Sequence, residues 1–322
     1  EDLIKSEPVV VTISRNAYIK RVPLSTFRVQ GRGGRGLIGQ SLRSDDAVAR
    51  ILTTNTLDTI LCFTNTGNVY SLRVYKIPAF ERTARGTPII NLLSMTPHER
   101  VTAIVSLKEF SKPYLFMCTK RGRVKKCKLS EFANLRATGK RAISLEADDS
   151  LDFVLPTNGD DSVLITSRKG YSVCFKENEV RAMGAQARGV VGIRLRGDDD
   201  AVIGLDRADD DKELLVVSEL GYGKRTKLSL FRQTHRASKG IISMKVRPKT
   251  GYLVSACVVS PDEEVIIISV EGMVIRLQVK EISEQGRSAM GVRLINLKEG
   301  DKVSSVEVIT KEEKESPLFT SN

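Results

Sequence analysis

The chain has 322 residues, 41% of them hydrophobic, and a formal net charge of +12. This is enough apolar residues for a buried core, and the excess of Lys and Arg favours a polyanionic partner, nucleic acid first and an anionic membrane surface second. No run of eighteen apolar residues occurs, so we expect no membrane-spanning helix. The chain begins with Glu rather than Met, and we expect it to be a piece of a longer protein.

A short apolar strand recurs six times along the chain, at 9–14, 59–64, 114–119, 162–167, 213–218 and 265–270. A turn and a second β-rich run follow each copy, which predicts six hairpins. The turn position is occupied, in chain order, by Ala17, Gly67, Gly122, Gly170, Gly221 and Gly272. Glycine suits a turn that needs a positive φ.

A second glycine recurs in the same phase, at Gly36, Gly86, Gly139, Gly189, Gly240 and Gly291. Apolar residues follow it, mostly at the fourth and sixth positions, and predict a third strand with alternating inward side chains. A fourth apolar run ends each unit. Six four-stranded units of about fifty residues predict an all-β, radially repeated disc of six blades. We expect one domain over 1–322 with repeats at 9–58, 59–112, 113–161, 162–212, 213–264 and 265–310, and a tail at 311–322.

Positive charge gathers in one part of every repeat. The six segments from the first glycine position to the second hold 26 Lys and Arg against 6 Asp and Glu, whereas the rest of the chain is mildly acidic. One series of cations lies four residues after the turn, and another directly precedes the second glycine. We expect a basic belt around the disc, formed by Lys20, Arg21, Arg73, Arg85, Lys125, Lys126, Lys140, Arg141, Arg188, Lys224, Arg225, Arg236, Lys239 and Arg276.

Repeated cations fit the repeated phosphates of duplex DNA. Single-strand binders instead use stacking aromatic side chains, and this chain has 5% aromatic residues and no Trp. The belt therefore favours a duplex bent around the perimeter and bound through its backbone.

The stretch QGRGGRG at 30–36 spells the G-x-G-x-x-G pattern of dinucleotide-binding loops. No crossover helix follows it, so a cofactor loop is disfavoured. An RNA-binding arginine-glycine tag is also disfavoured, because the motif is single and lies within a folded repeat. We expect a loop whose backbone closely approaches phosphates, with Arg32 and Arg35 as cations.

Cysteine and histidine offer no framework for catalysis. The five Cys residues lie mostly in apolar runs and contain no C-x-x-C, as is typical of core residues in a reducing compartment. His98 and His235 are isolated, which disfavours zinc or Ser-His-Asp chemistry. The acidic clusters at 197–200 and 208–211 lack EF-hand spacing and are read as solvated loops.

These features together resemble the C-terminal domain of the DNA gyrase A subunit, over essentially the whole chain. The resemblance rests on QGRGGRG (30–36), YIKRVPLSTF (18–27), ARGTPIINLL (84–93), GRVKKCKLSEF (122–132), VRAMG (180–184), GYGKRT (221–226) and KGIISMKV (239–246). It implies a six-bladed β-pinwheel whose blades exchange strands and which wraps DNA with positive handedness, so that the holoenzyme introduces negative supercoils.

The resemblance also identifies residues 30–36 as the gyrase A box, usually Q-R-R-G-G-K-G. Here the loop consists of Gln30, Gly31, Arg32, Gly33, Gly34, Arg35 and Gly36. Arg35 replaces Lys, and Gly31 replaces Arg and removes one cation. No catalytic residue is implied in this part of gyrase.

The family further implies a monomeric, non-catalytic domain without its own cofactor, in a cytoplasmic or organellar, nucleoid-associated enzyme. ATP and Mg2+ would be used elsewhere, and the partners would be the rest of gyrase A and gyrase B. Two alternatives are the C-terminal domain of the topoisomerase IV A subunit, which wraps poorly, and a propeller scaffold for an acidic protein. An enzyme with a site at the central channel is disfavoured, because no set of His, Cys or carboxylate residues recurs there.

Overall fold

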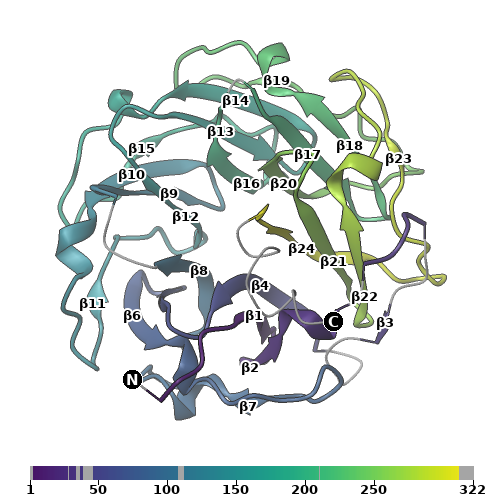
Figure 1. Cartoon of the computed structure of the whole chain (residues 1–322). Coiled ribbons are helices and arrows are strands. Elements are labelled where there is room, and N and C mark those ends of the chain that lie inside the picture. Colours follow the sequence, from purple (N-terminus) through teal and green to yellow (C-terminus); the bar gives the residue numbers. More distant parts are fainter. Residues whose placement is uncertain are drawn as a thin grey trace.

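The computed structural model describes residues 3–27, 29–33, 37–38, 46–107, 112–209 and 211–311, with the backbone alone for 37–38. The described residues form six four-stranded antiparallel sheets, which are arranged as blades around a common axis (Figure 1). The predicted all-β, six-bladed fold is therefore confirmed.

The four strands of each blade lie side by side, in order from the centre of the disc to its rim (Figure 1). From centre to rim, blade 1 consists of β4 (Val48–Asn55), β1 (Pro8–Ser14), β2 (Tyr18–Pro23) and β7 (Thr87–Pro88). Blade 2 consists of β8 (Val101–Leu107), β5 (Thr59–Thr64), β6 (Asn68–Arg73) and β11 (Lys140–Arg141). Blade 3 consists of β12 (Leu151–Thr157), β9 (Tyr114–Thr119), β10 (Arg123–Lys128) and β15 (Val190–Val191). Blade 4 consists of β16 (Val202–Arg207), β13 (Ser162–Ser167), β14 (Tyr171–Lys176) and β19 (Ile241–Ile242). Blade 5 consists of β20 (Leu253–Val259), β17 (Glu213–Ser218), β18 (Tyr222–Lys227) and β23 (Val292–Arg293). Blade 6 consists of β24 (Val303–Ile309), β21 (Glu264–Ser269), β22 (Met273–Gln278) and β3 (Leu37–Ile38).

Short 3-10 helices connect the strands. They are η1 (Leu24–Thr26), η2 (Val74–Lys76), η3 (Ile89–Asn91), η4 (Leu129–Phe132), η5 (Glu177–Glu179), η6 (Leu228–Leu230) and η7 (Val279–Glu281). Within the described ranges, no helix is long and apolar enough to cross a membrane.

Neighbouring repeats exchange a strand. The outermost strand of each blade comes from the next repeat, and β3 of the first repeat completes blade 6. In every repeat the exchanged strand has two residues and directly follows the second glycine. The sequence predicted a longer third strand, and that predicted length is wrong. Ile90, one of its expected inward residues, is 48% exposed, whereas its counterparts Ile143 and Ile193 are buried.

The two glycine series exist because blades approach each other closely. Gly67 has a φ of 85°, and a Cβ there would lie 2.2 Å from the carbonyl oxygen of Ile143 in the next repeat. Gly86 has a φ of 98°, and its Cβ would lie 2.5 Å from the carbonyl oxygen of Ile19 in blade 1. Both positions therefore exclude a side chain on two grounds, backbone conformation and space. Ala17 keeps the positive φ, at 64°, without being glycine.

The buried hydrophobic residues of the described ranges form six clusters, each of which joins two neighbouring blades. The cluster between blades 6 and 1 packs Val10 and Leu24 with Ile266 and Ile309. This packing and the pairing of β3 with β22 close the ring between the two ends of the repeat array. Burial of apolar area between blades is thus the main stabilising term of the disc.

The cysteines belong to this core, as predicted. All five are free thiols, and four are buried. Burial raises the pKa of Cys62 to about 12, which keeps this thiol protonated and unreactive at neutral pH.

Candidate nucleic-acid interface

Five of the predicted belt residues are exposed, namely Arg73, Lys140, Arg141, Arg188 and Lys239. Lys140 and Arg141 form the rim strand β11 itself, and Arg188 and Lys239 lie one residue before Gly189 and Gly240, which lead into β15 and β19. Because these strands are the outermost of their blades, the four cations follow the outer edge of the disc over blades 2, 3 and 4 (Figure 1). We call Lys140, Arg141, Arg188 and Lys239 the rim cations.

Three other predicted residues are half-buried: Arg21, Arg85 and Arg236. The Arg85 guanidinium stacks 3.8 Å from the ring centroid of Tyr18 in blade 1. Nη1 of Arg236 donates a hydrogen bond to the carbonyl oxygen of Val191, at 3.1 Å. Both side chains therefore lie near the rim while also bridging adjacent repeats.

Six predicted belt residues are buried, so their expected exposure on the perimeter is wrong. They are Lys20, Lys125, Lys126, Lys224, Arg225 and Arg276. All six are on second strands, three or four residues after the turn, where both faces of the sheet are covered by neighbouring blades. We call this set the interblade cations.

Five of the six interblade cations donate hydrogen bonds to the next repeat, and Lys125 donates within its own. Arg276 Nη1 donates to the carbonyl oxygen of Phe27 at 2.9 Å, and its Nε contacts the Glu264 carboxylate at 2.5 Å. Arg225 repeats this arrangement with the carbonyl oxygen of Ile282 and with Glu213, at 2.7 and 2.8 Å.

Lys126 and Arg21 act in the same way. Lys126 Nζ donates to the carbonyl oxygen of Glu177 at 3.2 Å, and Arg21 Nε donates to that of Ile77 at 2.6 Å. The cations four residues after the turn therefore connect each of their blades to the segment that follows the second strand of the next repeat.

The buried lysines hold backbone carbonyls. Lys224 Nζ donates to the carbonyl oxygens of Gly286 and Arg287, at 2.5 and 2.7 Å. Lys20 Nζ donates equivalently to those of Arg82 and Ala84. Burial, and then a nearby Arg guanidinium, lowers the pKa of each lysine to about 8. Lys125 Nζ donates to the carbonyl oxygen of Ala142 at 2.7 Å, and burial likewise lowers its pKa.

One sequence signal could have identified two of these buried cations. Glu213 and Glu264 each lie twelve residues before Arg225 and Arg276, at the start of the preceding strand of the same hairpin. A carboxylate at the start of an otherwise apolar strand indicates a buried ion pair, since an unpaired charge is seldom buried.

A third cation series, six residues after the turn, was missed apart from Arg73. Its other members are Lys128, Lys176 and Lys227, at the ends of β10, β14 and β18. Lys128 and Lys227 are exposed, and Lys176 is half-buried. The signal that could have identified this series is the recurrence of Lys or Arg six residues after the turn in four repeats.

The start of the 30–36 loop is attached to repeat 6. The backbone N–H of Gln30 donates to the carbonyl oxygen of Arg276, and that of Gly33 to Leu294, both at 2.7 Å. Gly31, Arg32 and Gly33 are exposed. Gly33 has a φ of 78°, whereas a Cβ on Gly31 meets nothing within 4 Å. Residues Gly34, Arg35 and Gly36 lie outside the described residues.

The corresponding loop of repeat 5 repeats this geometry with different residues. Ala237, three positions before the second glycine as Gly33 is, has a φ of 66° and donates its N–H to the carbonyl oxygen of Gly192. This attachment is therefore shared by repeats 1 and 5, and Ala237 shows that it does not require a glycine.

Among the described residues no group of three or more His, Cys, Asp or Glu side chains could hold a metal ion. His235 is exposed and contacts Glu179 at 3.2 Å.

Comparison with known proteins agrees with this geometry. The family model "DNA gyrase C-terminal domain, beta-propeller" matches residues 8–55, 58–108, 113–158, 161–209, 212–260 and 263–310. The chain is similar to the DNA gyrase A subunit of Escherichia coli, with 42% identity over 321 residues, 99% of this chain and 37% of the relative. It is 41% identical to that of Staphylococcus epidermidis over 317 residues, 97% of this chain and 35% of the relative.

The chain thus spans little more than a third of the length of these curated relatives. Among solved structures, a DNA gyrase A C-terminal domain superposes with a TM-score of 0.85 at 27% identity, covering 94% of this chain and 100% of that one. The C-terminal domain of a DNA topoisomerase IV superposes with a TM-score of 0.70 at 24% identity, covering 97% of each chain, and shows a shared fold.

Proposed function

Because this chain belongs to the DNA gyrase C-terminal domain family, we propose that it binds duplex DNA along the rim and bends it around the disc. The observation that carries the proposal is the set of rim cations, exposed on three successive blades. Each phosphate neutralised by Lys or Arg releases condensed counterions, which favours binding without reading the base sequence. The exposed start of the 30–36 loop, fixed at Gln30 and Gly33, adds Arg32 beside blade 6.

A bent duplex requires contacts over several blades. Bending by half a turn over roughly 40 base pairs costs about 10 kcal/mol of elastic energy. One basic patch does not offset this cost, whereas cations distributed along the rim each add a phosphate contact. The interblade cations contribute indirectly, because they fix the loops on which exposed residues lie.

In the whole protein, we propose that the wrap has positive handedness and presents a DNA crossing to the catalytic part of gyrase, which converts it into negative supercoils. The chain itself would carry no catalytic residue and no cofactor, and ATP and Mg2+ would act elsewhere in a complex with gyrase B. A cytoplasmic or organellar, nucleoid-associated setting follows from this role.

The linking number of a plasmid that is relaxed by a nicking-closing enzyme in the presence of the chain tests wrapping. A circular plasmid is incubated with the 322-residue chain and a nicking-closing enzyme, then deproteinised. We expect topoisomers with positive writhe, increasing with the ratio of protein to DNA. A linking number that does not change at any ratio overturns the wrapping proposal.

Binding of a short linear duplex, measured as a function of salt, separates wrapping from simple binding. A rim that neutralises several phosphates gives a steep fall of affinity with salt. Weak binding even at low salt would instead favour the scaffold for an acidic protein. Tight binding without a linking-number change would favour topoisomerase IV-like behaviour.

A further inference from the structure

Four basic side chains line one cavity at the inner edge of blades 1, 2 and 3. The cavity has a volume of about 390 Å3, and its lining includes Arg15, Arg50, Arg100, Lys120 and Asp152. Asp152 is the single carboxylate among the described residues that line it. The wall therefore carries an excess of positive charge that the rim DNA does not explain, because the inner strands lie far from the outer edge (Figure 1).

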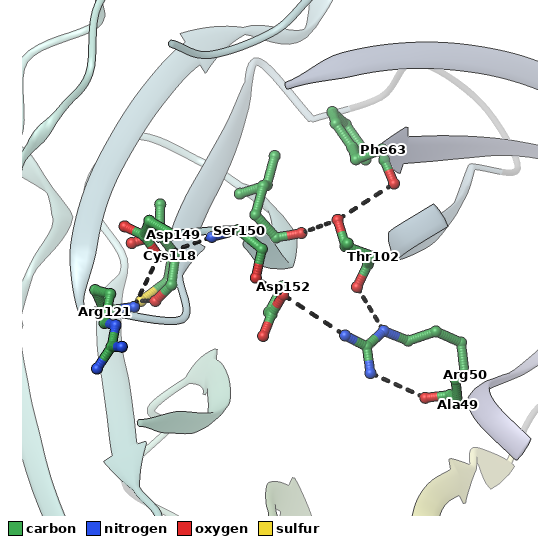
Figure 2. Close-up of polar contacts among 11 residues, drawn as sticks. Ala49, Arg50, Phe63, Thr102, Cys118, Arg121, Asp149, Ser150 and Asp152 are labelled. Atoms are coloured by element: carbon green, nitrogen blue, oxygen red, sulfur yellow. Dashed lines mark hydrogen bonds and ion pairs between the residues drawn. The ribbon is translucent and has the colours of Figure 1, made fainter. Parts of the chain in front are cut away.

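Arg50 is held in a fixed orientation by the contacts drawn in Figure 2. Its Nε donates to the carbonyl oxygen of Thr102 at 2.5 Å and its Nη1 to that of Ala49 at 2.9 Å. Its Nη2 lies 3.7 Å from Asp152 Oδ1, which is too long for a hydrogen bond. The guanidinium plane is thus set by backbone, and Nη2 keeps donor capacity for a ligand.

The other three cations have fixed backbones and unengaged side chains. The N–H groups of Arg15 and Lys120 donate to backbone carbonyl oxygens, and the N–H of Arg100 donates to Asn65, all at 2.8 Å. All three residues are exposed, and their side chains form no hydrogen bond or ion pair with any described residue. Their charges are therefore available to a solute.

The charges act on one another across the cavity. Burial lowers the pKa of Arg50; the Asp152 carboxylate opposes this shift, and the nearby Arg100 guanidinium adds to it. Burial raises the pKa of Asp152, an effect that Arg50 and Lys120 partly oppose. An anion placed between them would relieve the repulsion among the cations.

The cavity is particular to one side of the disc. The residues that match Arg50 in register on the inner strands of blades 4, 5 and 6 are Gly204, Ser255 and Ser305. None of these carries a charge, so the fold alone does not require a cation here. The sequence supplies one only where Arg15, Arg100 and Lys120 surround it.

We propose that this cavity, the Arg50 cavity, binds a small anion with two or three linked phosphates. Four cations against one carboxylate leave about three positive charges, which suits such an anion. Clefts of about 300–1,000 Å3 accept small molecules, and a DNA duplex is too wide to enter one. Arg and Lys are the side chains that recognise phosphate oxygens.

Calorimetric titration of the 322-residue chain with pyrophosphate at constant ionic strength tests the site. We expect saturable binding that the double variant Arg100→Gln/Lys120→Gln weakens at least about tenfold, because two charge-assisted contacts are lost. The matched control, Arg188→Gln/Lys239→Gln, removes the same charge from the rim and should leave pyrophosphate binding within about twofold. If ATP competes with pyrophosphate, the phosphates that occupy the cavity belong to a nucleotide. If ATP does not compete, the ligand is free pyrophosphate.

Two results with the double variants overturn the proposal. One is equal loss of pyrophosphate binding in the rim variant, which would place the anion on the DNA surface. The other is loss of duplex binding in Arg100→Gln/Lys120→Gln, which would make the cavity part of that surface. The variant Asp152→Asn provides an opposite readout, because removal of the carboxylate should tighten pyrophosphate binding several-fold. Unchanged or weaker pyrophosphate binding by Asp152→Asn, when circular dichroism shows that the variant is folded, also contradicts the proposal.

Discussion

The rim cations and the interblade cations are the same residue types at similarly regular spacing, yet they lie in opposite environments. Lys239 is exposed beside a rim strand, whereas Lys224, fifteen residues earlier in the same repeat, is completely buried against the next repeat. The difference teaches that periodic charge in a repeat protein has two uses. One side chain can bind a ligand that runs along the repeats, and another can hold one repeat to the next.

The largest effect is expected from an interblade ion pair. Arg225→Met removes the partner of the buried Glu213 carboxylate, and we expect the free energy of unfolding to fall by about 3–5 kcal/mol. Urea titration followed by circular dichroism measures it. The control Arg188→Met removes an exposed contact to Glu146 at 3.3 Å and should change stability by no more than about 1 kcal/mol.

The double variant Arg225→Met/Glu213→Leu sharpens this prediction. Replacement of both charges by apolar groups should recover most of the loss, because no buried charge remains without a partner. Equal instability of the single and double variants would show that the hydrogen bond to Ile282 matters more than the ion pair.

Loss of rim cations should affect DNA and not stability. For Arg188→Gln/Lys239→Gln we expect the slope of log affinity against log salt to decrease in magnitude by about 1.8, if each cation neutralises one phosphate. Duplex binding at several salt concentrations measures the slope. An unchanged slope would remove these two residues from the DNA path.

The buried lysines make stability depend on pH at the alkaline end. Lys20 and Lys224 have a pKa of about 8 in the folded state, against 10.5 when unfolded. Between these values the unfolded chain binds more protons, so the contribution of each lysine to stability rises as pH increases from about 8 to 10.5. Urea midpoints across this window should increase less in Lys224→Met than in the parent chain, and parallel profiles would contradict the assignment.

The smallest effect concerns the 30–36 loop. Gly31 has open space around it, so Gly31→Arg should fold normally and should increase the magnitude of the salt slope by about 0.9 through one added phosphate contact. Gly33→Ala is the contrasting change, because its positive φ of 78° disfavours any side chain and should lower stability by about 1 kcal/mol. A clear stability loss in Gly31→Arg would show that this position is packed in solution.

Much of the fold could be predicted from local sequence. The hairpins follow from apolar runs around Gly67 or Gly122, and these glycines do adopt positive φ. Strand exchange was predicted only from the family resemblance, because a two-residue strand such as Lys140–Arg141 has no periodicity of its own. Its partner β6 belongs to another repeat, and pairing across repeats leaves no local pattern.

The sequence by itself determined the number of blades, the positions of the turns and the surplus of positive charge, since these depend on residue type and spacing along the chain. Only the tertiary structure decided which cations face solvent and which face a neighbouring blade. Lys125 and Lys140 look alike in the sequence, but one is fully buried and the other exposed. The physical reason is that the second strand of each hairpin is covered on both faces when blades pack, whereas the strand after the second glycine forms the outer edge.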